Sequence, residues 1–338
     1  MTMQFHEILE RRAVVSGSAS VSVTAVGTLR VVGTAQSDLI LVSFEQDQVT
    51  IVCNGMRESL ARTSVRRLRI DGGDGDDRLQ NLTNLRATVL GGDGRDTLLG
   101  GRGRDTLFGG TGQDLLHGSA GNDIYCGGDA IDEDFSEDGS IDVVDLGAAA
   151  SAVRVRASLI QAEGLPFVPA FIGVIGNLPS SGEPATGERD LIHARTIDVV
   201  RLSAFSDDVF FNDPSTPDFA IPVTILCGNG DDSVRAGGNT LSSFGENGDD
   251  DFFYSSDVEA GLASMTVSGG AGNDVLRGDP ALSDSIDLGN GTDSLIFDPN
   301  YQTPISLPAG CENVEGIVGS EDREITILGN DLNNTILS

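Results

Sequence analysis

The chain has 338 residues and a mass of 35.2 kDa, and its 52 acidic residues against 21 basic ones leave a formal net charge of −31. A field this negative repels phosphate backbones and anionic bilayers, which excludes nucleic-acid binding and polybasic membrane binding. No segment has the roughly 20 apolar residues that a membrane span needs, so we expect no membrane insertion. The 44 Gly residues disfavour helices, while 39 % apolar residues is too many for a disordered acidic tail. The composition therefore favours an all-β structure that buries many small apolar residues.

Residues 1–12 are predicted to be a leader or a disordered segment. They carry charged residues and lack the continuous apolar stretch of an ordinary signal peptide. Glu7–Ser16 is similar to the E-x-L-E-x-R-x-x-L-S element near the start of some bacterial exported repeat proteins, with Val15 in place of Leu.

Residues 13–71 are predicted to form a short β cap at the N-terminus. Leu29–Val32, Leu39–Phe44 and Gln48–Cys53 are β-rich runs separated by turn residues, and Asn54-Gly55 is a hairpin signal. A cap at this place would cover the strand edges that the end of a solenoid exposes.

Residues 72–135 form the first block of a nine-residue repeat. Residues 91–126 read GGDGRDTLL, GGRGRDTLF, GGTGQDLLH and GSAGNDIYC without interruption; GGDGDDRLQ precedes them at Gly72, and a decayed copy follows at Gly127. Gly-Asp runs are usually solvated acidic linkers, but a linker does not keep an apolar residue two positions behind each Asp. The pattern favours a solenoid in which stacked units bury these apolar residues together.

The repeat predicts columns of carboxylates. If alternate nonads stack, Asp96 lies above Asp114 and Asp105 above Asp123, at about the 4.8 Å spacing of neighbouring strands. Two carboxylates this close repel by roughly 3 kcal/mol at an effective dielectric constant of 20. A stack of this kind needs counter-ions, and oxygen ligands from carboxylates and turn carbonyls suit calcium. No cluster of His or Cys competes for a softer metal.

Residues 136–226 are predicted to be a β insertion with degenerate repeats. Val153–Ile160 and Thr196–Leu202 have the pattern of strands. Pro166–Arg189 is rich in Pro, Gly and Ser and is predicted to be a loop, whose apolar part Phe167–Ile175 we expect to be buried against its own scaffold.

Residues 227–338 are predicted to be a second repeat block with degenerate C-terminal copies. GGAGNDVLR begins at Gly269, and weaker copies begin at Cys227, Gly245 and Leu288. More decayed copies surround Asp38 and Asp207 in the preceding regions.

The nonads resemble the glycine- and aspartate-rich haemolysin-type calcium-binding repeats of the RTX family. The resemblance implies a right-handed parallel β-roll or β-helix solenoid with two nonads per coil, and several calcium ions held between the turns of successive coils. The sixth-position aspartates would be the metal ligands: Asp77, Asp96, Asp105, Asp114, Asp123, Asp132, Asp232, Asp250, Asp274 and Asp293.

The leading functional hypothesis is a secreted, non-catalytic protein that folds on binding extracellular calcium. The expected affinity is that of extracellular modules, about 10⁻⁴ to 10⁻³ M. Its role would be structural or adhesive, at the cell surface or outside the cell, and the candidate partner besides calcium is a cell-surface or matrix component. An adhesin or surface-layer component is a variant of this hypothesis.

An alternative hypothesis is a polysaccharide-acting parallel β-helix enzyme with its site in 136–226. Its candidate residues are Asp190, Arg195, Asp198 and Arg201. Asp198 and Arg201 are three positions apart and would face opposite sides of a strand, which weakens the hypothesis. The zinc-protease and lipase motifs H-E-x-x-H and G-x-S-x-G do not occur.

The four cysteines are Cys53, Cys126, Cys227 and Cys311. Three pairings are possible, and the sequence does not choose among them. We expect buried free thiols, with one or two disulfides as the alternative in an oxidising compartment.

Overall fold

The computed structural model describes residues 11–14, 19–117, 120–128, 141–147, 153–160, 168–175, 188–193, 197–210, 223–237, 241–255, 266–278, 285–297, 305–306, 308–316, 327–328 and 335–337. Their secondary structure is β apart from one 3₁₀ turn, Arg62–Ser64, which confirms the all-β prediction. In these ranges no helix is long and apolar enough to cross a membrane. The chain divides into two units, Met1–Asp145 with Glu188–Ile197, and Leu146–Gly187 with Asp198–Ser338.

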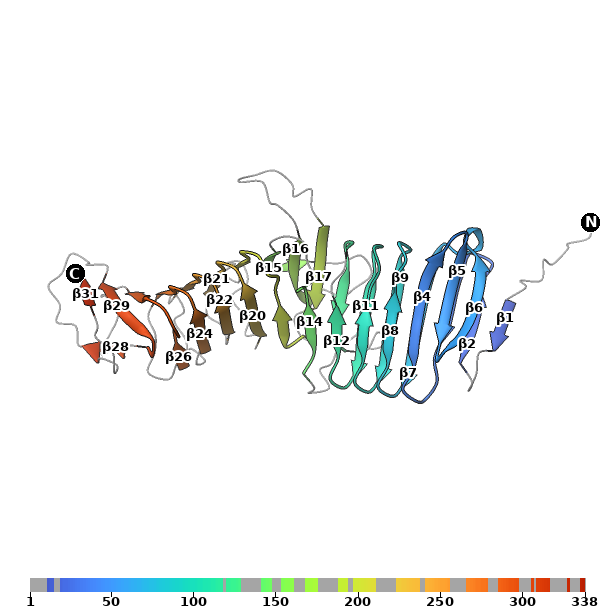
Figure 1. The fold of residues 1–338 in the computed structure, drawn as a ribbon, viewed down its shortest axis with the longest axis horizontal. Helices are drawn as coiled ribbons and strands as arrows, with labels where there is room; N and C mark the ends of the chain where they lie inside the picture. Colours follow the sequence, from blue (N-terminus) through green and yellow to red (C-terminus); the bar gives the residue numbers. More distant parts are fainter. Residues whose placement is uncertain are drawn as a thin grey trace, which may run out of the picture. The chain divides into compact units, whose positions relative to one another are not determined.

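The first unit is a parallel β-roll with two faces, called face A and face B (Figure 1). The strands of face A are β1 (Arg11–Val14), β2 (Ser20–Val23), β3 (Thr28–Val32), β7 (Arg67–Asp74), β9 (Ala87–Asp93), β11 (Thr106–Thr111), β13 (Ile124–Cys126) and β17 (Glu188–His193). The strands of face B are β4 (Leu39–Glu45), β5 (Gln48–Cys53), β6 (Met56–Ala61), β8 (Arg78–Asn81), β10 (Thr97–Leu99), β12 (Leu115–His117) and β14 (Val143–Asp145).

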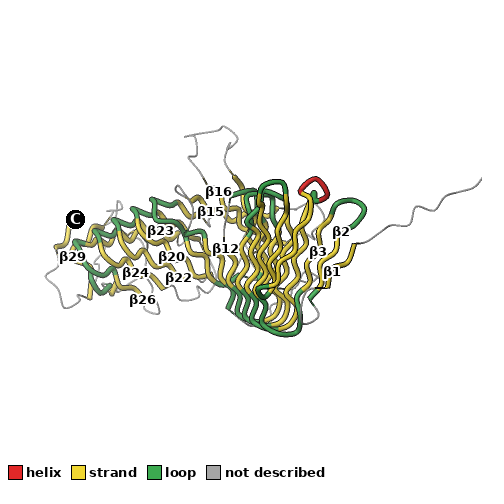
Figure 2. Tube along the Cα trace, turned by 45° about the vertical axis from the view of Figure 1, so that its right-hand side comes forward, coloured by secondary structure: helices red, strands yellow, loops and turns green. Residues whose placement is uncertain are grey.

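Each coil of the repeat region contains two nonads, as predicted. In face A, Thr106 pairs in parallel with Thr88 on one side and with Ile124 on the other. In face B, Thr97 pairs with Leu115 in the next coil. The partners are two nonads apart, so alternate nonads stack directly. Figure 2 shows the result, with the loops between the strands of this unit lying in rows.

The interior of the roll is filled by the eighth residue of each nonad. Leu98, Leu107, Leu116 and Tyr125 are each 0 % exposed. Leu98 and Leu116 each lie in the middle of a three-residue strand whose neighbouring side chains are more exposed, because side chains alternate along a strand. Burying one such side chain contributes about 1.5–3 kcal/mol, which a single nonad could not obtain alone.

The N-terminal strands include antiparallel pairs, among them the hairpin predicted at Asn54-Gly55. On face B, β4 pairs with β5 and β5 with β6. The turn between β5 and β6 has φ of 48° at Asn54 and 80° at Gly55. These left-handed values are those of the two-residue hairpin turn that the Asn-Gly pair predicts.

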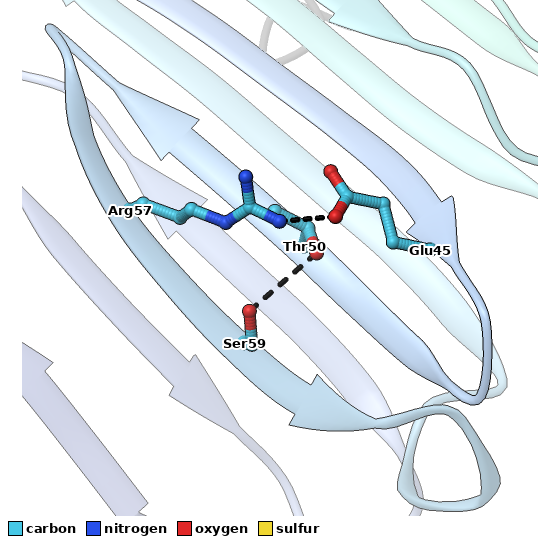
Figure 3. A network of polar contacts seen from close by, with 4 residues as sticks. All are labelled: Glu45, Thr50, Arg57 and Ser59. Atoms are coloured by element: carbon cyan, nitrogen blue, oxygen red, sulfur yellow. Dashed lines mark hydrogen bonds and ion pairs between the residues drawn. The ribbon is translucent and has the colours of Figure 1, made fainter.

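Polar contacts join strands β4, β5 and β6 of the cap (Figure 3). Arg57 of β6 forms an ion pair with Glu45 of β4, and the hydroxyl oxygens of Thr50 and Ser59 are 3.5 Å apart on β5 and β6. The exposed ion pair contributes little to stability. Because β6 is the last strand of its sheet, its charged residues disfavour the addition of a further strand.

The second unit is also built of parallel strands. They are β15 (Val153–Ile160), β16 (Val168–Ile175), β18 (Val199–Arg201), β19 (Asp208–Phe210), β20 (Val223–Asn229), β21 (Ser233–Gly237), β22 (Leu241–Asn247), β23 (Asp251–Ser255), β24 (Thr266–Ala271), β25 (Val275–Arg277), β26 (Ser285–Asp287), β27 (Asp293–Phe297), β29 (Cys311–Gly316) and β31 (Thr335–Leu337), with β28 (Ile305–Ser306) and β30 (Ile327–Leu328) as a separate pair. Among the described strands of this unit the antiparallel exception is β15 with β16.

The prediction of a loop over Pro166–Arg189 is wrong for the first half of this segment. Val168–Ile175 is strand β16 and pairs with β15 along its whole length. The β-branched and aromatic residues of this segment favour a strand more strongly than its Pro and Gly oppose one. The strand predicted at Val153–Ile160 is confirmed, and the one at Thr196–Leu202 is shorter, covering Val199–Arg201.

Replacement of Gly91 by Ala should destabilise the roll strongly. A Cβ on Gly91 would lie 2.2 Å from Oδ2 of Asp96 and 2.3 Å from the carbonyl oxygen of Gly109, so neighbouring coils would have to separate. We expect Gly91→Ala to lower the free energy of unfolding by more than about 3 kcal/mol, the upper range for overpacking. Urea denaturation followed by circular dichroism measures this.

The matched control is Gly55→Ala in the cap. No atom lies within 4 Å of a Cβ at this position, but its φ of 80° is unfavourable for Ala. The expected cost is therefore only that of a left-handed residue, about 1–2 kcal/mol. Equal costs for the two variants would contradict the packing argument.

Candidate metal centre

The sixth-position aspartates are buried in both units. Nine of the ten predicted ligands lie in described residues, and each is at most 3 % exposed: Asp77, Asp96, Asp105, Asp114, Asp123, Asp232, Asp250, Asp274 and Asp293. Asp132 lies outside the described residues. A carboxylate removed from water is costly unless hydrogen bonds or a cation compensate it, so the partners of these groups decide what the site can bind.

In the first unit, one column of aspartates follows the turns by which the chain passes from face A to face B. We call this side the first edge. The backbone N–H of Asp38 donates to Oδ1 of Asp77, that of Asp77 to Asp96, that of Asp96 to Asp114, and that of Asp114 to Asp142, over 2.7–2.9 Å. Each carboxylate thus ties its coil to the coil before it.

A shorter column follows the second edge, where the chain returns from face B to face A. The backbone N–H of Ala87 donates to Oδ1 of Asp105, and that of Asp105 donates to Oδ1 of Asp123, both over 2.7 Å. Asp96 and Asp114 therefore stack on one edge and Asp105 and Asp123 on the other, as the sequence predicts.

The second unit has a column of the same design. Each backbone N–H donates to the carboxylate of the following member over 2.6–2.9 Å. The members in chain order are Asp207, Asp232, Asp250, Asp274, Asp293 and, with a Glu in the role of Asp, Glu312. The weaker repeats of this unit are therefore built as the strong ones are.

The second carboxylate oxygen has no hydrogen-bond donor in many of these turns. The buried Oδ2 atoms without one include those of Asp77, Asp96, Asp232, Asp250, Asp274 and Asp293. A buried oxygen left without a partner carries its full desolvation cost. These atoms therefore require a proton or a cation.

The unpartnered oxygens meet a backbone oxygen of the next coil. Oδ2 of Asp96 and the carbonyl oxygen of Gly109 lie 2.2 and 2.3 Å from the point that a Cβ of Gly91 would occupy. At Gly269 the corresponding atoms are Oδ2 of Asp274 and the carbonyl oxygen of Leu288, at 2.2 and 2.4 Å. The first Gly of the nonad thus lets two oxygen atoms from successive coils approach its Cα closely, at a point where a Cβ would collide with both.

In the absence of metal, burial and neighbouring acids raise the pKa of these carboxyl groups above the ordinary value of 3.8. Desolvation, opposed by the hydrogen bond from the preceding coil, raises the pKa of Asp77 to about 7 and that of Asp96 to about 6. In the second unit the same causes raise the pKa of Asp232 to about 8 and that of Asp250 to about 7. Nearby carboxylates raise all four further.

The available oxygens fit a hard cation. Calcium accepts carboxylate and backbone carbonyl oxygens in flexible geometry, which matches the atoms that converge at the first Gly of each turn. Within the described ranges no three His, Cys, Asp or Glu side chains gather at one point, so turn carbonyls would have to supplement the carboxylates. The four cysteines are buried free thiols, as predicted, and form no soft-metal site.

Two turns satisfy their aspartate internally, which sequence reasoning missed. The N–H and hydroxyl of Thr34 donate to Oδ2 of Asp38 over 2.5 and 2.9 Å. The N–H of Ser203 donates to Oδ2 of Asp207 over 2.8 Å, and its hydroxyl to Oδ1 over 2.7 Å. The signal that could have revealed them is a hydroxyl residue at the second position of the nonad, four residues before the Asp.

The described candidate residues of the enzyme hypothesis are divided between the two units. Asp190 belongs to β17 of the first unit, whereas Asp198 and Arg201 belong to the second unit. Arg195 lies outside the described residues.

The metal-free protein should lose stability as the pH rises. Because the folded state holds carboxyl groups with a pKa of about 6 to 8, against an ordinary value of 3.8, it binds more protons than the unfolded state between these values. Stability is therefore fully present below about pH 4 and decreases up to about pH 8. Each unit of pKa elevation corresponds to about 1.4 kcal/mol. Thermal unfolding in chelator across this range measures the slope.

Two single substitutions separate this effect from general charge repulsion. Asp232→Asn removes a buried titrating group and should flatten the slope. Asp47→Asn removes one exposed charge and should leave the slope unchanged. A midpoint that rises with pH in the metal-free wild type would contradict the electrostatic description of the columns.

Comparison with known proteins agrees with this geometry. A sequence profile of the RTX calcium-binding nonapeptide repeat matches four copies, at residues 69–80, 88–132 and 266–281. These segments contain the turns that begin at Gly72, Gly91, Gly109 and Gly269. No curated protein matches the chain significantly. The chain thus carries the calcium-binding nonapeptide repeats of the RTX family, stacked as a parallel β-roll.

Proposed function

We propose that the protein binds several calcium ions between its coils and that this binding drives its folding. The observation that carries the proposal is the row of buried Oδ2 atoms without a hydrogen-bond donor. They occur in both units and in consecutive turns, so a single ion would not compensate them. The first-edge and second-unit aspartates and the turn carbonyls would hold the ions.

The charge of the chain supports a folding switch. At neutral pH the unfolded chain carries a net charge of −31 and gains nothing from bringing carboxylates together. Calcium binds the stacked carboxylates in preference to the dispersed ones, so its binding free energy becomes folding free energy. At a calcium concentration 100-fold above the dissociation constant, each site contributes about 2.7 kcal/mol.

We further propose that the protein acts outside the cell or at its surface, in a structural or adhesive role. An expected dissociation constant of about 10⁻⁴ to 10⁻³ M would leave the sites empty at cytosolic calcium levels and filled outside. A non-catalytic role is consistent with the columns, since their carboxylates already accept backbone N–H groups and serve to stack coils. A cell-surface or matrix component remains the proposed partner.

Calcium should raise the β content and the thermal midpoint of the protein at neutral pH. We expect a large increase on addition of about 10 mM calcium to the chelated protein, measured by circular dichroism and calorimetry. Magnesium at the same concentration is the control. It should have a much smaller effect, because magnesium demands octahedral geometry and keeps its water. Identical melting curves with calcium and with chelator would contradict the proposed function.

A further inference from the structure

The two edges of the first unit differ, although their nonads match the same consensus. The turns 91–96 and 100–105 read GGDGRD and GGRGRD, and they follow each other directly in the chain. Asp96 and Asp105 occupy the same position, and each is 1 % exposed. Sequence alone therefore assigns the two aspartates the same role.

Their second carboxylate oxygens have different partners. Oδ2 of Asp96 is buried without a hydrogen-bond donor. Oδ2 of Asp105 accepts the backbone N–H of Gly101 over 2.6 Å, while its Oδ1 accepts that of Ala87. Oδ2 of Asp123, next on the same edge, lies 3.4 Å from the hydroxyl of Tyr125, which donates to it. The second edge thus supplies protein donors to Asp105 and Asp123, whereas Oδ2 of Asp77 and Asp96 on the first edge has none.

The backbone conformation of the second residue of each nonad accounts for this difference in hydrogen-bond partners. Gly73 and Gly92, which precede Asp77 and Asp96, have left-handed φ values of 105° and 115°. Gly101 is not left-handed and turns its N–H toward Asp105. The backbone N–H of Gly101 therefore compensates the carboxylate of Asp105 on the second edge, whereas the carboxylate of Asp96 on the first edge needs a cation.

The second unit shows the same relation independently. Gly228 and Gly270 have left-handed φ values of 104° and 108°, and Oδ2 of Asp232 and Asp274 has no donor. Ser203 is not left-handed, and its N–H donates to Asp207. The conformation of the second residue thus separates turns that need a cation from turns that do not.

The exposed charges of the two edges are opposite. In the first-edge turns 72–77 and 91–96, the exposed acidic residues are Asp74, Asp76 and Asp93, and the exposed basic residue is Arg95. On the second edge, the exposed charges of the turns 82–87 and 100–105 are Arg86, Arg102 and Arg104. A divalent cation is attracted to the first edge and repelled from the second.

We propose that in the first unit calcium binds along the first edge and not along the second, where backbone and side-chain donors hold Asp105 and Asp123. This inference rests on the proposed function, because it specifies which turns the ions occupy. It divides the predicted ligands into a metal-binding set on the first edge and a purely structural set on the second.

The substitutions Asp96→Asn and Asp105→Asn form a matched pair. Asp96→Asn should reduce the calcium stoichiometry in titration calorimetry and shrink the calcium-induced rise of the thermal midpoint. It should leave the midpoint in chelator unchanged or higher, because it removes an unpartnered oxygen. Asp105→Asn should lower the midpoint equally with calcium and with chelator, because it disturbs the bond from Gly101, and should leave the stoichiometry at the wild-type value.

A fall in stoichiometry for Asp105→Asn equal to that for Asp96→Asn would overturn the inference. If Asp105→Asn does not fold, anomalous diffraction from wild-type crystals grown in calcium decides the same question. Within the first unit, ions beside first-edge aspartates such as Asp77 and Asp96, with none beside Asp105 or Asp123, support the inference. Ions beside Asp105 or Asp123 overturn it while leaving the proposed function standing. A wild-type protein that binds no calcium overturns both.

Discussion

The structure depends on one interaction, the hydrogen bond from the backbone N–H of one aspartate to the carboxylate of the aspartate one coil further along. It recurs from Asp38 to Asp142 in the first unit and from Asp207 to Glu312 in the second. Each bond fixes the register of two coils, and it also brings a carboxylate into the interior. Two coils therefore cannot stack without burying a carboxylate. Because an unpartnered buried oxygen is costly, the roll becomes stable only when the remaining oxygen of each carboxylate is neutralised.

Neutralisation is achieved in two ways. At Asp38, Asp105 and Asp207 the second residue of the turn donates its own backbone N–H. At Asp77, Asp96 and Asp274, whose turns have a left-handed second residue, Oδ2 has no protein donor and lies near a carbonyl oxygen of the next coil, so a proton or a cation must compensate it. The first kind of turn is complete without metal, and among the described residues two of its examples, at Asp38 and Asp207, are the first members of the columns of their units. These turns give each unit a metal-independent start from which calcium-dependent coils can extend.

The sequence was sufficient for features with a fixed period. The burial of Leu98 and Leu107, the stacking of Asp96 on Asp114 and the Asn54-Gly55 hairpin all follow from local spacing, and each is confirmed. The strand Val168–Ile175 was missed because Pro and Gly outweighed its β-branched residues in a local reading. Asp142 was missed because an insertion interrupts the period before it. The difference between Asp96 and Asp105 could not be predicted, because it depends on the backbone conformation of Gly92 and Gly101, which packing against the preceding coil decides.

The most direct test of this account is the number of protons released when calcium binds. Titration calorimetry at about pH 6.5 in two buffers of different ionisation enthalpy measures it. Because burial raises the pKa of Asp77 and Asp250 to about 7, calcium must displace protons from these columns, and the account predicts a net release. Calcium binding without any proton release would show that the ions do not meet the buried carboxylates, and would contradict the account.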